Sequence, residues 1–116
     1  DETHFDGAMR PGTNCADAPV LHRGKAGWLL EHLDDGFTVL VFGAGPAVRA
    51  LSSAGITARV LCVGEDIADA QGLLARRYDG TPGTVYLIRP DHHVAGRWRS
   101  FDAQRIEQAI ARACGR

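Results

Sequence analysis

The chain has 116 residues, which fit one compact domain and leave no room for a second hydrophobic core. Apolar residues make up 45% of the sequence and charged residues 23%, a composition that excludes a disordered tail. The 13 basic and 14 acidic residues give a formal net charge of -1, so no basic field is available to bind nucleic acid or anionic lipid.

Membrane spans and disulfides are not expected either. The longest nearly uninterrupted apolar run, Phe37 to Ala44, is too short to cross a bilayer, and no amino-terminal segment resembles a signal peptide. The cysteines are odd in number and widely spaced, without a CxxC pair or zinc-ligand spacing: Cys15, Cys62 and Cys114. We therefore expect a reducing compartment, the cytoplasm.

The first residues predict a linker. The chain begins at Asp1 without a methionine, and its first fourteen residues carry no periodic apolar pattern, so we expect a fragment of a longer protein. We divide the chain into an amino-terminal arm or linker, residues 1–25, and a domain, residues 26–116. The spacing of apolar residues in Ala26–Leu33 predicts one or two helical turns at the start of this domain.

The next segments predict a βαβ unit. Phe37–Phe42 is a continuous β-branched and aromatic run, as expected for a strand buried on both faces of a parallel sheet. Pro46 suits the first turn of a helix and Gly55 its end, so we predict a short helix over residues 47–54. Arg59–Val63 is the next strand, and a right-handed crossover would make the two strands parallel.

The second half predicts a helix, a hairpin and a final helix. Asp66 can cap a helix that reaches Tyr78 and ends at Asp79-Gly80. Thr84–Ile88 and Val94–Trp98 flank a connection so short that the two strands must form an antiparallel hairpin. The apolar positions of the last helix are Ala103, Ile106, Ala109, Ile110 and Ala113, with Ser100 or Asp102 as its cap.

This order of elements is that of a thioredoxin-like α/β fold: a βαβ-α-ββα core with a mixed four-stranded sheet and an amino-terminal extension. Pro82 stands just before the third core strand, where thioredoxin-like proteins commonly hold a cis proline. We therefore predict a cis peptide bond at Pro82.

The loop Gly43–Pro46 is the position where a thioredoxin-fold enzyme carries its reactive thiolate, at the start of the first helix. No nucleophile is present there, and Cys62 lies in a predicted buried strand, where packing is the simpler role. The loop also imitates a dinucleotide-binding loop, with Glu65 about twenty residues on as ribose acceptor. However, Val48 occupies the position of the third glycine.

We accordingly predict no catalytic, cofactor-binding or metal-binding residue in this chain. Two alternatives stay open: a stand-alone thioredoxin-like thiol oxidoreductase that uses Cys62 or Cys114, and a degenerate nucleotide-binding module built on Gly43–Pro46. The adjacent pair His92 and His93 lacks companion ligands, so we expect a hairpin turn with one of them at positive φ. Trp98 should lie on one face of its strand and Arg97 and Arg99 on the other, and we expect this face or the last helix to dock on another domain or subunit.

The segment Arg89-Pro90-Asp91-His92-His93-Val94-Ala95-Gly96-Arg97 resembles the RPDGHVAWR signature near the carboxyl end of FAD-dependent aromatic hydroxylases, of the phenol hydroxylase and polyketide hydroxylase type. Pro11-Gly12 with Ala18-Pro19 resembles the PG…AP segment of that family, and Leu29-Leu30 followed by Gly36–Leu40 resembles its LL…GFTLL stretch. The resemblance spans nearly the whole chain.

The resemblance implies a non-catalytic, thioredoxin-like carboxyl-terminal domain that serves stability, interdomain packing or dimerisation in a flavin monooxygenase. FAD, the NAD(P)H donor and the phenolic substrate would be bound by preceding flavin and substrate domains, which would be the partners of this domain, together with a second copy in a homodimer. The signature residues matched here would be structural: Arg89, Pro90, Asp91, His93, Val94, Ala95 and Arg97. Two positions depart from the signature: His92 stands in place of the turn glycine, and Gly96 in place of the usual tryptophan. Trp98, two residues later on the same face of the strand, could compensate for the missing tryptophan.

Overall fold

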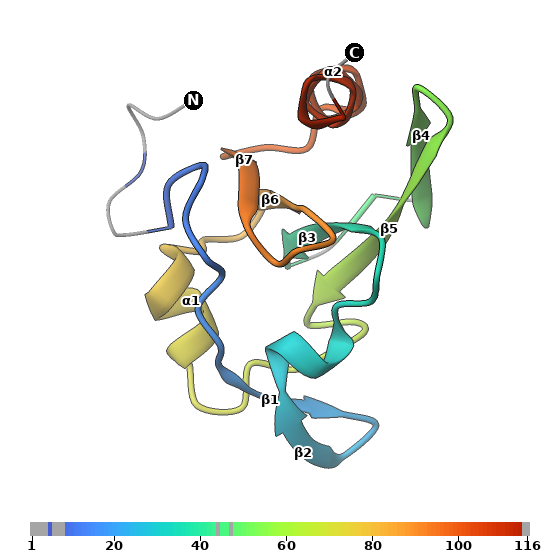
Figure 1. Cartoon of the computed structure of the whole chain (residues 1–116). Helices are drawn as coiled ribbons and strands as arrows, with labels where there is room; N and C mark the ends of the chain where they lie inside the picture. The colour runs from blue at the N-terminus through green and yellow to red at the C-terminus, as the bar shows by residue number, and fades with distance from the viewer. Residues whose placement is uncertain (1–4, 6–8, 44, 47, 115–116) are drawn as a thin grey trace.

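A computed structural model describes residues 5, 9–43, 45–46 and 48–114 of the chain. A five-stranded mixed sheet forms its centre, in the order β4-β5-β3-β6-β7 (Figure 1). Strand β3 (Phe37–Phe42) pairs in parallel with β5 (Ile56–Val63), and the other pairs of neighbouring strands are antiparallel. The thioredoxin-like α/β fold predicted from the sequence is therefore present, with one strand more than the four predicted.

Strand β3 is the centre of the hydrophobic core. All six of its residues are buried, as its continuous apolar run predicts. Its alternate side chains divide between two clusters: Val39 and Val41 face helix α2 (Ala103–Ala113), whereas Leu40 and Phe42 face helix α1 (Leu73–Tyr78) and the amino-terminal segment. Figure 1 shows these two layers on opposite sides of the sheet.

The helix predicted over residues 47–54 is wrong. Ala47 lies outside the described residues, and Ala50–Ser53 forms strand β4, an antiparallel edge strand beside β5. Ala54 (φ 54°) and Gly55 (φ 80°) both have positive φ, which makes the tight two-residue turn of a β-hairpin. Gly55 thus has the left-handed backbone that the helix prediction required, but it serves a hairpin turn.

The helix predicted from Asp66 to Tyr78 is present only in its second half. Ala68 exchanges backbone hydrogen bonds of 2.9 and 2.8 Å with Leu21, which holds this part of the chain extended. Helix α1 begins after Gly72 (φ 71°), and its first amide groups bind the carboxylate of Asp69, which accepts from Leu74 and Ala75 at 3.0 and 2.9 Å. The capping carboxylate of α1 is therefore Asp69 and not Asp66.

The carboxyl-terminal half otherwise follows the prediction. Strands β6 (Val85–Ile88) and β7 (Val94–Trp98) form the antiparallel hairpin, and His92 in its turn has φ 62°, the positive φ predicted for one of the two histidines. Asp102 caps helix α2, and its carboxylate accepts a hydrogen bond from the Arg105 amide. Its buried residues face the sheet: Ile106, Ala109 and Ile110.

The amino-terminal part forms a second, two-stranded sheet. Strands β1 (Pro19–His22) and β2 (Lys25–Trp28) pair antiparallel, and the single 3₁₀ turn η2 (Leu29–His32) follows. The helical turns predicted from Ala26 are thus limited to η2, because Arg23 and Gly24 adopt positive φ and turn the chain back into β2. The division of the chain into an arm, residues 1–25, and a domain, residues 26–116, stays a prediction. Strands β1 and β2 pair with each other across this boundary.

The prediction of a cis proline is wrong, since every described peptide bond is trans, including that of Pro82. Pro82 and Gly83 are the central residues of a turn closed by the hydrogen bond from the Thr84 amide to the Thr81 carbonyl, at 2.9 Å. Gly83 has φ 96°. A trans proline followed by a glycine at positive φ is the pairing that a type II turn requires.

Candidate functional site

The loop after β3 occupies the position of the reactive thiol in a thioredoxin-fold enzyme. Ala44 lies outside the described residues. Gly43 donates its amide hydrogen to the Val63 carbonyl at 2.9 Å, and the Gly45 amide donates to the Glu65 carboxylate at 2.9 Å. Among the described residues between β3 and β5 there is no helix, so no helix dipole is available to lower a thiol pKa or to attract a phosphate.

These contacts test the resemblance to a dinucleotide-binding loop. Two amides that a phosphate would need are already hydrogen-bonded within the protein, and Glu65 caps the loop where a dinucleotide site would use it for ribose. A Cβ atom on Gly45 would lie 2.1 Å from the Cys62 sulfur, so glycine here makes room for a thiol. The described residues of this loop do not fit a dinucleotide.

Cys62 lies beneath this loop in an ion-pair cluster. The Arg49 guanidinium binds both carboxylate oxygens of Asp66, at 2.8 and 2.7 Å, and Asp66 also accepts the Cys62 amide at 2.7 Å. Burial raises the pKa of the Asp66 carboxyl, but the hydrogen bonds from Arg49 and Cys62 outweigh burial and hold the pKa below its ordinary value. The cluster therefore fixes the turn after β5.

The thiols of Cys15 and Cys62 lack the environment of a nucleophile. Cys62 is fully buried, and burial, followed by the nearby charges of Asp66 and Glu65, raises the pKa of its thiol. Cys15, placed by sequence in the linker, is also buried, and burial raises the pKa of its thiol to about 11. A neutral thiol is a poor nucleophile, so both residues act as packing groups near neutral pH. Cys114, at the end of α2, is half-buried.

The histidines do not gather into a metal site: among residues 5, 9–43, 45–46 and 48–114, no group of three or more metal-ligating side chains was found. His92 has the positive φ of the turn, and His93 lies 3.1 Å from the Asp91 carbonyl through its Nδ1 atom. The structure also brings together His22 and His32, with ring centroids 5.1 Å apart. Their ten-residue separation in sequence gave no signal of this pair.

The signature segment 89–97 forms the β6–β7 turn and a contact with the leading segment, residues 9–18. Arg89 binds the carboxylate of Asp91 within the turn, which closes through backbone hydrogen bonds from the Arg89 amide to the His93 carbonyl at 2.8 Å and from the His92 amide to the Arg89 carbonyl at 2.9 Å. The leading segment is hydrogen-bonded to the signature segment: the Gly12 amide donates to the Val94 carbonyl at 2.7 Å, and the Cys15 amide donates to the His92 carbonyl at 2.9 Å. Two motifs that are distant in sequence are thus hydrogen-bonded to each other.

The two faces of β7 are both covered. Arg97 is 4% exposed and its guanidinium lies 4.5 Å from the centre of the Phe5 ring, and Arg99 lies over the same ring at 3.9 Å. On the other face the Trp98 indole covers Gly96, where an added Cβ atom would approach it to 2.7 Å. Trp98 therefore occupies space above Gly96, the position where the family signature has tryptophan.

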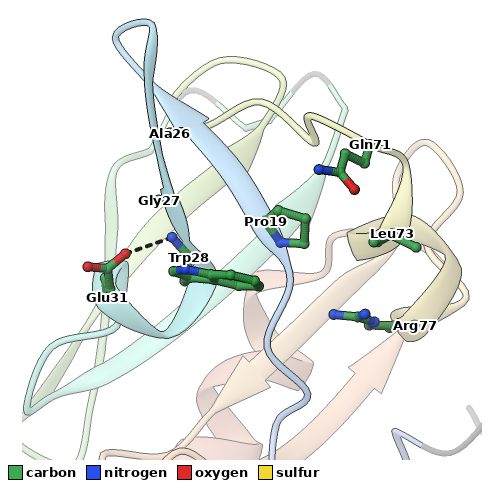
Figure 2. A pocket seen from close by; sticks show the side chains of 8 residues that line it. All are labelled: Pro19, Ala26, Gly27, Trp28, Glu31, Gln71, Leu73 and Arg77. Atoms are coloured by element: carbon green, nitrogen blue, oxygen red, sulfur yellow. Dashed lines mark hydrogen bonds between the residues drawn. The ribbon is translucent and has the colours of Figure 1, made fainter.

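A groove not predicted from the sequence lies between the β1–β2 hairpin and α1. It encloses about 530 Å³, and Figure 2 shows Trp28 from β2 opposite Leu73 and Arg77 from α1. Trp28 is 51% exposed, although the predicted helix would have packed it on a buried face. The sequence offers Gly24 as a residue that suits a tight turn, but it does not show whether Trp28 is exposed.

No helix in the described part of the chain is long and apolar enough to cross a membrane. A family described as "Aromatic-ring hydroxylase, C-terminal" matches residues 8–116. No curated protein matches the chain.

Solved structures agree with this family match. A crystal structure of aklavinone-11 hydroxylase with FAD and aklavinone is 23% identical, with a TM-score of 0.77, over 95% of this chain and 22% of that chain. The flavin-dependent monooxygenase PieE, in complex with FAD and substrate, is 22% identical, with a TM-score of 0.79, over 97% of this chain and 21% of that chain. This chain thus spans about a fifth of the length of these two proteins.

A third structure, a mutant of PrxQ from Xylella fastidiosa, is 15% identical, with a TM-score of 0.61, over 95% of this chain and 98% of that chain. At such identities the structures show the fold alone. The family match covers nearly the whole chain, and it agrees with the signature, the fold and the two hydroxylase structures. The chain therefore belongs to the family of aromatic-ring hydroxylase carboxyl-terminal domains.

Proposed function

We propose that this chain is the non-catalytic carboxyl-terminal domain of an FAD-dependent aromatic monooxygenase. The observation that carries the proposal is the family match over residues 8–116, together with the two flavin-dependent enzymes of which a similar domain is about a fifth. The expected partners of this domain are the preceding flavin and substrate domains of the same chain. The expected location of the protein is the cytoplasm.

In the parent enzyme, FAD reduced by NAD(P)H would activate O₂, so that one oxygen atom enters an aromatic ring and the other leaves as water. No step of this reaction is assigned to the present chain. The loop amides of Gly43 and Gly45 are hydrogen-bonded internally, and the thiols of Cys15 and Cys62 are buried with raised pKa values. These contacts support a role in stability, interdomain packing or dimerisation.

The signature residues support the same role. We propose that Arg89, Pro90, Asp91, His93, Val94, Ala95 and Arg97 are structural: they shape the β6–β7 hairpin and position the leading segment that pairs with it. The hydrogen bonds between Gly12 and Val94 and between Cys15 and His92 support this role.

The test begins with the coding sequence upstream of Asp1. We expect it to encode a flavin-binding fold, and we expect the complete protein to contain FAD and to oxidise NAD(P)H faster when a phenolic substrate is present, with a hydroxylated product. A complete protein without an upstream flavin fold would contradict the proposal.

A further inference from the structure

The groove between the β1–β2 hairpin and α1, which we call the Trp28 groove, has the composition of a protein interface. Trp28, Pro19 and Leu73 form its apolar part, and Glu31, Gln71 and Arg77 are polar residues at its border (Figure 2). Tryptophan and arginine are enriched among the residues that contribute most to binding between proteins, and an apolar centre with a polar rim is typical of interfaces. Trp28 and Val48 are the exposed large apolar residues found in the described part of the chain.

The groove is held in shape by hydrogen bonds of its lining residues and of the segments beside it. Glu31 accepts the backbone amide of Trp28 at 2.7 Å, and Leu21 in β1 is hydrogen-bonded to Ala68 in the segment before α1. The Asp17 carboxylate accepts the Leu30 amide at 3.0 Å, which links the leading segment to η2. A preformed groove loses little conformational freedom on binding.

The surfaces that the sequence suggested for docking are already occupied. The apolar side of α2 packs on the sheet, and Trp98 covers Gly96. The Trp28 groove is therefore the better candidate for a contact with another domain.

The path of the chain indicates which domain this is. The leading segment runs beside α1, where Arg77 donates to the Asp17 carbonyl and the Tyr78 hydroxyl donates to the Ala16 carbonyl at 2.6 Å, and it then reaches Pro19 in the groove wall. Figure 1 shows this segment passing α1 before it enters β1. Helix α1 thus contacts both the groove and the leading segment, which on the proposed function joins this domain to the preceding domains.

We propose that the Trp28 groove is the surface on which the preceding, flavin-bearing part of the parent chain docks. This rests on the proposed function, in which about four-fifths of the enzyme lies outside the present chain, as in the two hydroxylase structures. The occupant is a segment of that part with a projecting apolar side chain and a carboxylate within reach of Arg77.

The test uses the complete parent protein and two variants, Trp28→Ser and the matched control Val48→Ser, which removes the other exposed large apolar residue, one that does not line the groove. Amide hydrogen exchange is measured across the whole protein. We expect Trp28→Ser to speed exchange about ten-fold in residues 19–28 and in one segment of the preceding part, since losing a central interface residue weakens docking by at least that factor. Exchange in β3 and α2 should not change, and Val48→Ser should leave both regions as in the unaltered protein.

Several results would overturn the inference. Unchanged exchange of the preceding part in the Trp28→Ser variant would do so, and so would protection of the groove that varies with protein concentration, since a second copy would then be the occupant. These results leave a flavin-bearing parent intact and contradict the docking surface alone. A complete protein without a flavin-bearing part would overturn both this inference and the proposed function.

Discussion

Gly45 is a residue whose role depends on a neighbour distant in sequence. Its amide is capped by Glu65, and the space that a side chain would need is filled by the Cys62 sulfur. A glycine loop after a buried strand resembles a dinucleotide site in sequence, but the structure uses the missing side chain for packing. Val48 at the position of the third glycine argues against a dinucleotide site in sequence, and the contact with Cys62 explains why residue 45 is a glycine.

Gly45→Ala should destabilise the domain by about 1–3 kcal/mol, because the new methyl group would overlap the Cys62 sulfur. The double variant Gly45→Ala/Cys62→Ala should recover most of this loss, since the Cβ atom of residue 62 would remain at 3.5 Å. Urea unfolding of the four proteins gives the coupling energy. Gly36→Ala is the control, because an added Cβ atom there meets an Asp34 oxygen at 3.4 Å. Additive effects of the two changes would contradict the proposed overlap.

The three thiols should differ in reactivity. Cys15 and Cys62 are buried, and their pKa values are raised, to about 11 for Cys15. At pH 8, alkylation of the native protein should modify the half-buried Cys114 first, with Cys15 and Cys62 about a hundred-fold slower and released together by denaturant. Mass mapping of the modified peptides identifies each site. Rapid modification of Cys62 would favour the thiol oxidoreductase alternative.

At the scale of the elements, the sequence predicts best those segments whose signals are local. Strands β3 and β7 and helix α2 lie where their apolar patterns and caps place them. The helix predicted over residues 47–54 fails because a glycine at positive φ, here Gly55, ends a helix and turns a hairpin equally well. The pairing of β4 with β5 decides between the helix end and the hairpin turn.

The empty thiol position at Gly43–Pro46 follows from the sequence alone. The exposure of Trp28 does not, since it depends on how the β1–β2 hairpin packs against α1.

The role of Asp69 as the cap of helix α1 can be tested by substitution. Asp69→Ala removes the acceptor of two amides at the start of the helix and should cost about 1–2 kcal/mol of unfolding free energy. Asp102→Ala, which removes one such bond from α2, should cost about 1 kcal/mol and is the matched comparison. Chemical denaturation measures both. An Asp69→Ala protein as stable as the unaltered chain would show that another group caps α1.

For the whole molecule, stability should fall in acid through Asp66. Its pKa in the folded protein is below the ordinary value of 3.8, so between these two values the unfolded chain binds more protons and unfolding becomes easier. The contribution is complete above pH 3.8 and is lost as the pH falls through the folded value. Asp66→Asn should flatten this part of the stability profile, measured by urea unfolding between pH 2 and 6. Equal slopes in both proteins would contradict the role of the Arg49–Asp66 pair.

On the proposed function, the flavin chemistry of the whole molecule belongs to the preceding part of the parent and none of it to this chain. Equilibrium binding of FAD to the complete protein and to the 116-residue chain, measured side by side, tests this division most directly. We expect the complete protein to retain FAD through purification and the 116-residue chain to show no saturable binding, because the Gly43 and Gly45 amides are already hydrogen-bonded. Micromolar binding of FAD by the 116-residue chain would contradict this division of function.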